Sequence, residues 1–63
     1  METYYVLEIN TDFTELHGIT YSEAMQEFKS ALKNPANYGY DLTLLQINAS
    51  KMSGQSIIAS HRA

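Results

Sequence analysis

The chain has 63 residues, with seven acidic and four basic side chains, a net charge of −3 and no cysteine. This length gives a single domain, residues 1–63, that buries only about 60% of the surface its unfolded chain exposes, and no disulfide can add stability. We therefore expect marginal stability and a homodimer, which would add burial. The sequence shows neither a leader peptide nor a run of about 20 apolar residues, so we expect a cytoplasmic protein without a membrane anchor.

Residues 3–10, TYYVLEIN, are rich in aromatic and β-branched residues and alternate between two sets of side chains. This period of two predicts a β-strand. The set expected to face the core is Tyr5, Leu7 and Ile9. Tyr4 and Val6 then lie on the other face, exposed unless something covers them.

Residues 11–19, TDFTELHGI, connect this strand to the next element. Asp12 suits a turn, and Gly18 suits a left-handed residue before a helix. Phe13 and Leu16 are too apolar for a freely solvated loop. We expect the segment either to cap the open edge of the core or to form a short extra strand.

Residues 20–35, TYSEAMQEFKSALKNP, carry the signals of an amphipathic helix. Thr20 and Glu23 have the spacing of a capping box. Pro35 ends the helix because it forces Asn34 out of the α region. The apolar side chains fall in one stripe at helical spacing: Tyr21, Ala24, Met25, Phe28, Ala31 and Leu32. A helix with one apolar face packs that face on another layer, here a sheet.

Residues 40–48, YDLTLLQIN, predict a second strand whose alternation breaks in the middle. Leu42 and Leu44 share one face, whereas Leu45 and Ile47 share the other. Either a bulge near Leu44 and Leu45 shifts the phase, or both faces of the strand are covered.

Residues 56–62, SIIASHR, predict a short third strand that forms an antiparallel hairpin with the second. The predicted fold class is therefore α+β: a small β-α-β-β domain in which a three-stranded sheet carries one amphipathic helix packed on one face. If the first two strands are parallel neighbours, the helix connects them through a right-handed crossover.

Charge is segregated along the chain. Residues 1–28 contain six acids and no lysine or arginine, a net charge of −6, whereas residues 29–63 contain four bases and one acid, a net charge of +3. An acidic face attracts basic protein surfaces and repels phosphates, although such side chains can equally be ordinary solvated positions. The acidic residues expected to bind a partner are Glu8, Asp12, Glu15, Glu23 and Glu27.

Aromatic residues extend the predicted partner-binding site. Tyr38 and Tyr40 flank Gly39 directly after the helix, and tyrosine is enriched at interface hot spots. We include both tyrosines as anchors, with plain packing as the alternative.

A second function class uses the sheet. Tyr4 and Val6 on its free face, with Lys51 and Arg62, would form a nucleic-acid-binding surface that stacks bases. Four basic side chains against seven acids give no electrostatic attraction for phosphates. The composition therefore disfavours direct binding of nucleic acid.

No pattern of catalytic residues emerges from the sequence. His17 lies near Asp12 and Glu15, but the spacing matches no metal site, and His61 is close to the end of the sequence. The sequence has no G-x-S-x-G turn and no glycine-rich phosphate loop. We expect a protein that is not an enzyme and has no cofactor and no metal.

The layout of strand, T-x-x-E-A helix, glycine–aromatic turn and second strand resembles the small host-takeover proteins of bacteriophages, among them inhibitors of RNA polymerase. The matching pieces are residues 4–9, 20–32 and 39–47. The resemblance implies a protein that occludes a surface on a host enzyme or DNA-binding protein. It carries over no functional residue, because the matching positions are structural.

These observations predict a small, non-enzymatic protein–protein interaction module, encoded by a phage or mobile element, that inhibits or modulates a host protein through an acidic face. In a sharper version, the acidic side chains imitate DNA phosphates and occupy the basic groove of a DNA-binding protein or polymerase. The alternatives are a nucleic-acid-binding module that uses the sheet face and a structural subunit of a homo-oligomer.

Overall fold

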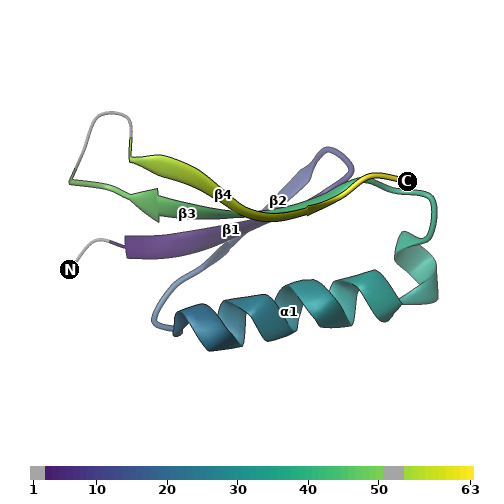
Figure 1. The fold of residues 1–63 in the computed structure, drawn as a ribbon, viewed down its shortest axis with the longest axis horizontal. Coiled ribbons are helices and arrows are strands. Elements are labelled where there is room, and N and C mark those ends of the chain that lie inside the picture. Colours follow the sequence, from purple (N-terminus) through teal and green to yellow (C-terminus); the bar gives the residue numbers. More distant parts are fainter. Residues whose placement is uncertain (1–2, 51–53) are drawn as a thin grey trace.

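The computed structural model describes residues 3–50 and 54–63, which form one helix packed on one face of a four-stranded sheet (Figure 1). The elements in chain order are β1 (Thr3–Ile9), β2 (Asp12–Leu16), α1 (Tyr21–Lys33), the short 3-10 helix η1 (Pro35–Asn37), β3 (Leu42–Asn48) and β4 (Gln55–His61). The strands lie in the order β2-β1-β3-β4, and every neighbouring pair is antiparallel. The predicted α+β class is confirmed.

The predicted number of strands is wrong, because the described residues contain a fourth strand, β2. Its segment is the one for which the sequence left a loop or a short extra strand open. A two-residue turn at Asn10 and Thr11 connects β1 to β2, and Asn10 has the left-handed φ of 59° that Asn tolerates in hairpin turns. Phe13 and Thr14 favour a strand whereas Asp12 and Glu15 do not, and pairing with β1 decides the structure of this segment.

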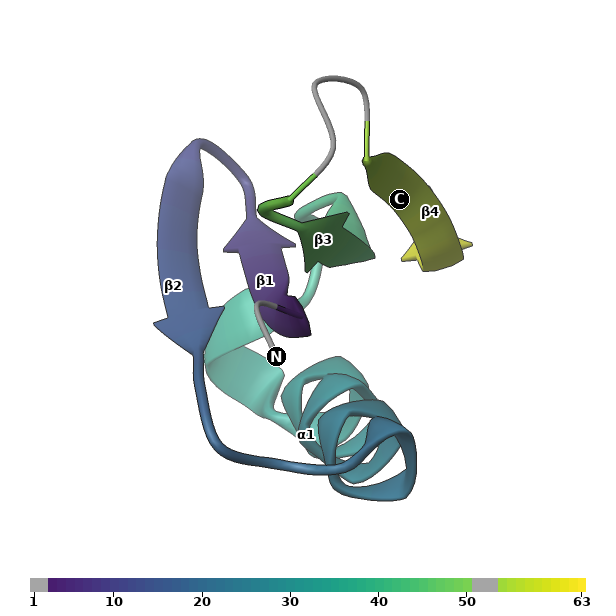
Figure 2. The same ribbon diagram turned by 90° about the vertical axis from the view of Figure 1, so that its left-hand side faces the viewer.

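The β1–β2 hairpin also determines the direction in which β3 runs relative to β1. Since β2 reverses the chain before α1, β3 runs antiparallel to β1 and pairs with it along its whole length, from Thr3 with Asn48 to Ile9 with Leu42. The conditional expectation of parallel neighbours and a right-handed crossover between them therefore does not apply. Both outer strands, β2 and β4, lie at free edges of the sheet (Figure 2).

The helix begins and ends as the sequence predicts. The Thr20 backbone N–H donates to Glu23 Oε1 over 2.8 Å, and the Glu23 N–H donates to Thr20 Oγ1 over 3.1 Å, which completes the capping box. Asn34 adopts an extended conformation, with φ −75° and ψ 119°, and Pro35 opens η1. Gly18 takes the predicted left-handed φ, at 70°.

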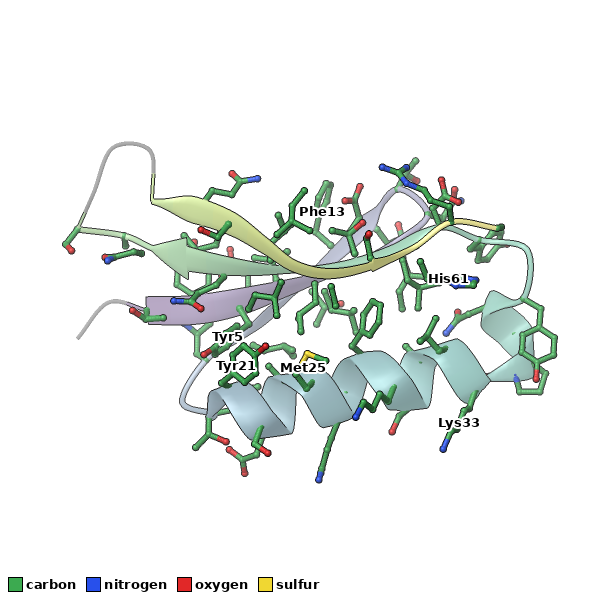
Figure 3. All side chains as sticks on the ribbon, in the orientation of Figure 1. Tyr5, Phe13, Tyr21, Met25, Lys33 and His61 are labelled. Carbon is green, nitrogen blue, oxygen red and sulfur yellow. The ribbon has the colours of Figure 1, made fainter. Side chains whose placement is uncertain are left out.

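The core lies between the helix and the sheet. Ala24 and Phe28 from α1 meet the face of the sheet that carries Tyr5, Leu42 and Leu44. Leu7 completes this buried cluster, and the Tyr5 and Tyr21 rings meet edge to face with their centroids 6.5 Å apart (Figure 3). The expected alternation of β1 is therefore confirmed.

The expected irregularity near Leu44 and Leu45 exists, but the extra residue belongs to β4. Leu44 pairs with Ala59 and Leu45 pairs with Ile57, so Ile58 has no counterpart on β3. The pairing of β3 with β1 stays continuous through the same residues. Strand β3 therefore keeps a strict alternation, with apolar side chains on both of its faces.

Candidate protein-binding face

The side of the sheet that faces away from α1 is the candidate site, and we call it the open face. Residues directly opposite each other in neighbouring strands point to the same side, so the register assigns its members. Strand β1 contributes Tyr4, Val6 and Glu8; β2 contributes Phe13 and Glu15; β3 contributes Thr43, Leu45 and Ile47; and β4 contributes Gln55, Ile57 and Ser60. Figure 3 shows Phe13 on the side of the sheet opposite the helix.

Apolar side chains occupy the middle of the open face. Leu45 pairs with Val6 on one side and with Ile57 on the other. These neighbours leave Leu45 only 7% exposed, although it lies outside the cluster beneath the helix. Phe13 and Ile57 remain 66% and 67% exposed, respectively. The open face therefore carries a small apolar centre flanked by two large exposed apolar side chains.

A hollow of about 430 Å³ lies on this face. Its lining comes from all four strands and from the segments next to them: Glu8, Asn10, Phe13, Asp41, Thr43, Leu45, Gln55, Ile57 and Arg62. Apolar side chains from both outer strands thus meet polar ones from the central strands in a single depression.

Two exposed polar contacts border the open face. His17 Nε2 lies 2.9 Å from Glu15 Oε1, and its ring stacks on Tyr4 with centroids 4.4 Å apart. At the other end, Asp41 accepts the Ala63 backbone N–H over 2.9 Å and Arg62 Nη1 over 3.4 Å. The Ala63 N–H, followed by the Arg62 guanidinium, holds the pKa of Asp41 below its ordinary value of 3.8.

The acidic residues predicted as one binding patch are divided between two layers. Glu8 and Glu15 lie on the open face of the sheet, and Asp12 begins β2 beside the hairpin turn. Glu23 uses its carboxylate in the capping box, and Glu27 is exposed on the helix. The fold thus brings Glu8 and Glu15 to one surface and places the two helix glutamates in the other layer.

The two predicted tyrosine anchors lie in a third place. Tyr38 is 68% exposed and Tyr40 is 43% exposed, both in the segment between η1 and β3. Tyr38 borders a separate depression together with Leu32 and Leu42. Neither tyrosine lines the hollow on the open face.

Sequence reasoning missed Phe13 and Ile57 as surface residues. The available signal for Phe13 was the alternation of the segment DFTEL, in which Phe13 and Glu15 must share a face if the segment is a strand. Ile58 and Ala59 both pack against the core cluster, because the bulge shifts the alternation of β4 at this point, and Ile57 then points to the open face.

The part of the chain that the structure describes has neither a metal-binding cluster nor a buried polar or charged residue. No group of three His, Asp or Glu side chains in residues 3–50 and 54–63 is arranged to hold a metal ion. None of the polar or charged residues in these two ranges is buried. Within the same residues, no helix is long and apolar enough to cross a membrane. Comparison of the chain with protein-family models, curated proteins and solved structures finds no match.

Proposed function

We propose that this protein is a non-enzymatic protein–protein interaction module that binds its partner through the open face of the sheet. The supporting observation is the apolar centre at Leu45, with Phe13 and Ile57 about two-thirds exposed on either side. Exposed apolar and aromatic side chains that gather on one surface are typical of protein–protein interfaces, and the open face carries two of them beside its apolar centre.

The negative charge of the open face indicates which kind of partner surface it would bind. The open face carries Glu8 and Glu15, and the whole chain has a net charge of −3. A complementary partner therefore presents an apolar patch with basic side chains around it. In its finer form, the proposal is that binding inhibits or modulates a host protein, as expected for a small phage or mobile-element protein.

Two other proposals receive less support from the geometry. A DNA mimic needs its acidic side chains on one surface, and Glu23 and Glu27 lie on the helix instead. For nucleic-acid binding by the sheet, Arg62 is in contact with Asp41, and Lys51 lies outside the described residues. The open face also contributes Glu8 and Glu15, which repel phosphates.

The test is affinity capture from a bacterial lysate with the tagged protein and a Phe13→Asp variant. We expect one partner to be retained by the wild type and lost by the variant, because binding would have to remove water from the new carboxylate beside the apolar centre, which costs free energy. Tyr38→Asp is the matched control, since Tyr38 is equally exposed and lies outside the open face. Circular dichroism of both variants is the check that they fold. Capture that survives Phe13→Asp would contradict the proposal.

A charge-reversal pair tests the role of the acidic side chains on the open face. Glu8→Lys should weaken capture most at low salt, whereas Glu27→Lys on the helix should leave it unchanged. Equal losses in the two variants would instead indicate a response to net charge. A mobility-shift assay with mixed oligonucleotides at low salt completes the test, and a shift at micromolar protein would favour the nucleic-acid alternative.

A further inference from the structure

The hollow on the open face combines two kinds of surface that suit one type of side chain. Phe13 from β2 and Ile57 from β4 supply apolar walls, and Leu45 supplies an apolar floor. Glu8 from β1, a half-buried residue, adds a carboxylate to the same lining. A long side chain with an apolar stem and a cationic head matches both surfaces.

Glu8 is the acid in this hollow that is available for such a head group. Asp41, the other acid in the lining, already accepts the Ala63 N–H and the Arg62 guanidinium. Among the residues that the structure describes, no basic side chain is in ion-pair contact with Glu8. Among the described residues that line the hollow, the two acids Glu8 and Asp41 stand against the single base Arg62, so these side chains carry a net negative charge.

We propose that this hollow receives an arginine side chain of the partner protein, with the guanidinium directed to Glu8. Arginine fits better than lysine for two reasons. Its planar head group is weakly hydrated and binds a carboxylate through two parallel hydrogen bonds, and it can also stack on an aromatic ring such as Phe13. This inference rests on the proposed function and names the contact that gives the open face its specificity.

The experiment uses a defined probe, because the partner is unidentified. An acetylated and amidated Leu-Arg-Leu tripeptide is titrated into isotope-labelled protein at low salt, and binding is followed through the backbone amide signals. We expect saturable shifts at Glu8, Phe13 and Leu45. The same tripeptide with glutamine in place of arginine should produce much smaller shifts.

Variants of the protein establish which carboxylate is used. Glu8→Gln should weaken the arginine tripeptide about fivefold, the loss expected for a favourable exposed ion pair. Glu27→Gln is the matched control, because it makes the same charge change on α1, outside the open face, and it should bind the tripeptide like the wild type. Equal affinity for both tripeptides, or an unchanged affinity in Glu8→Gln, would overturn the assignment.

The arginine in the hollow could also be Arg62 of a second copy of the chain, whose side chain is 79% exposed. Sedimentation of the free protein distinguishes this case from the arginine of a different protein. A monomer at the concentrations of the titration supports the arginine of a different protein. A dimer that Phe13→Asp dissociates would overturn it in favour of self-association. If the tripeptide fails while Phe13→Asp still abolishes capture from lysate, only the arginine assignment fails. Capture that survives Phe13→Asp refutes the proposed function itself.

Discussion

The two faces of the sheet arise from the same alternation of side chains, but a helix covers only one of them. On the side of α1, Leu44 and Ala24 are fully buried, because the helix lays its apolar stripe across the strands. On the open face, Leu45 is buried by neighbouring strands alone, while Phe13 and Ile57 stay exposed. Among the described residues α1 covers one face only, so Phe13 and Ile57 on the other face stay accessible, as the proposed interaction requires.

The largest expected loss of stability comes from a substitution in the core between α1 and the sheet. Leu44→Ala leaves a cavity beneath the helix and should reduce the free energy of unfolding by about 2–5 kcal/mol. A domain of this length has a total stability of roughly 3–9 kcal/mol, so the variant should be close to unfolding at 37 °C. Urea unfolding followed by circular dichroism measures the loss. A reduction below about 1 kcal/mol would show that the helix packs loosely on the sheet.

The neighbouring residue tests the open face with the same chemical change. Leu45→Ala should cost about 1–3 kcal/mol, less than Leu44→Ala, because the lost side chain lies beside solvent and its neighbours Val6 and Ile57 can relax into the gap. Both variants are compared in the same urea titration. Equal costs would mean that the open face is as tightly packed as the core, which would argue against its role as a free surface.

The sequence predicts the covered face well because its signals are local. The capping box at Thr20 and Glu23, and the spacing of Ala24 and Phe28, lie within one helix and need no partner to be recognised. The alternation of β1 is equally local. The apolar stripe of α1 and the alternation of β1 together predict which side of the sheet holds the core.

The open face could not be predicted in the same way because it depends on pairing between strands. The segment of β2 is rich in polar residues and exposed along most of its length, and only its register with β1 brings Phe13 and Glu15 beside Glu8 and Val6. The acidic set was predicted from charge along the chain. Order in sequence does not say which layer a side chain occupies, so a prediction from charge along the chain groups Glu23 and Glu27 with residues of the other layer.

A substitution at the exposed wall of the hollow should leave stability almost unchanged. Ile57 is 67% exposed, and Ile57→Ser should change the free energy of unfolding by less than about 1 kcal/mol, mostly through the lower strand propensity of serine. The same variant should lose partner capture, since it removes one apolar wall of the hollow. A large loss of stability would assign Ile57 to the fold and weaken the contrast between the two faces.

The smallest expected effect is electrostatic and belongs to the rim of the open face. The folded state lowers the pKa of Asp41 from 3.8, so the contact with Ala63 and Arg62 stabilises the protein above that pH and is lost as the pH falls through the lower, folded value. Asp41→Asn should therefore be slightly less stable than the wild type at pH 7, and the difference should shrink below pH 3.8. Because both charged side chains are largely exposed, added salt should also reduce it. Urea midpoints measured for both proteins across this pH range test the effect. A difference that persists at the lowest pH would assign the role of Asp41 to hydrogen bonds that the asparagine cannot make, rather than to its charge.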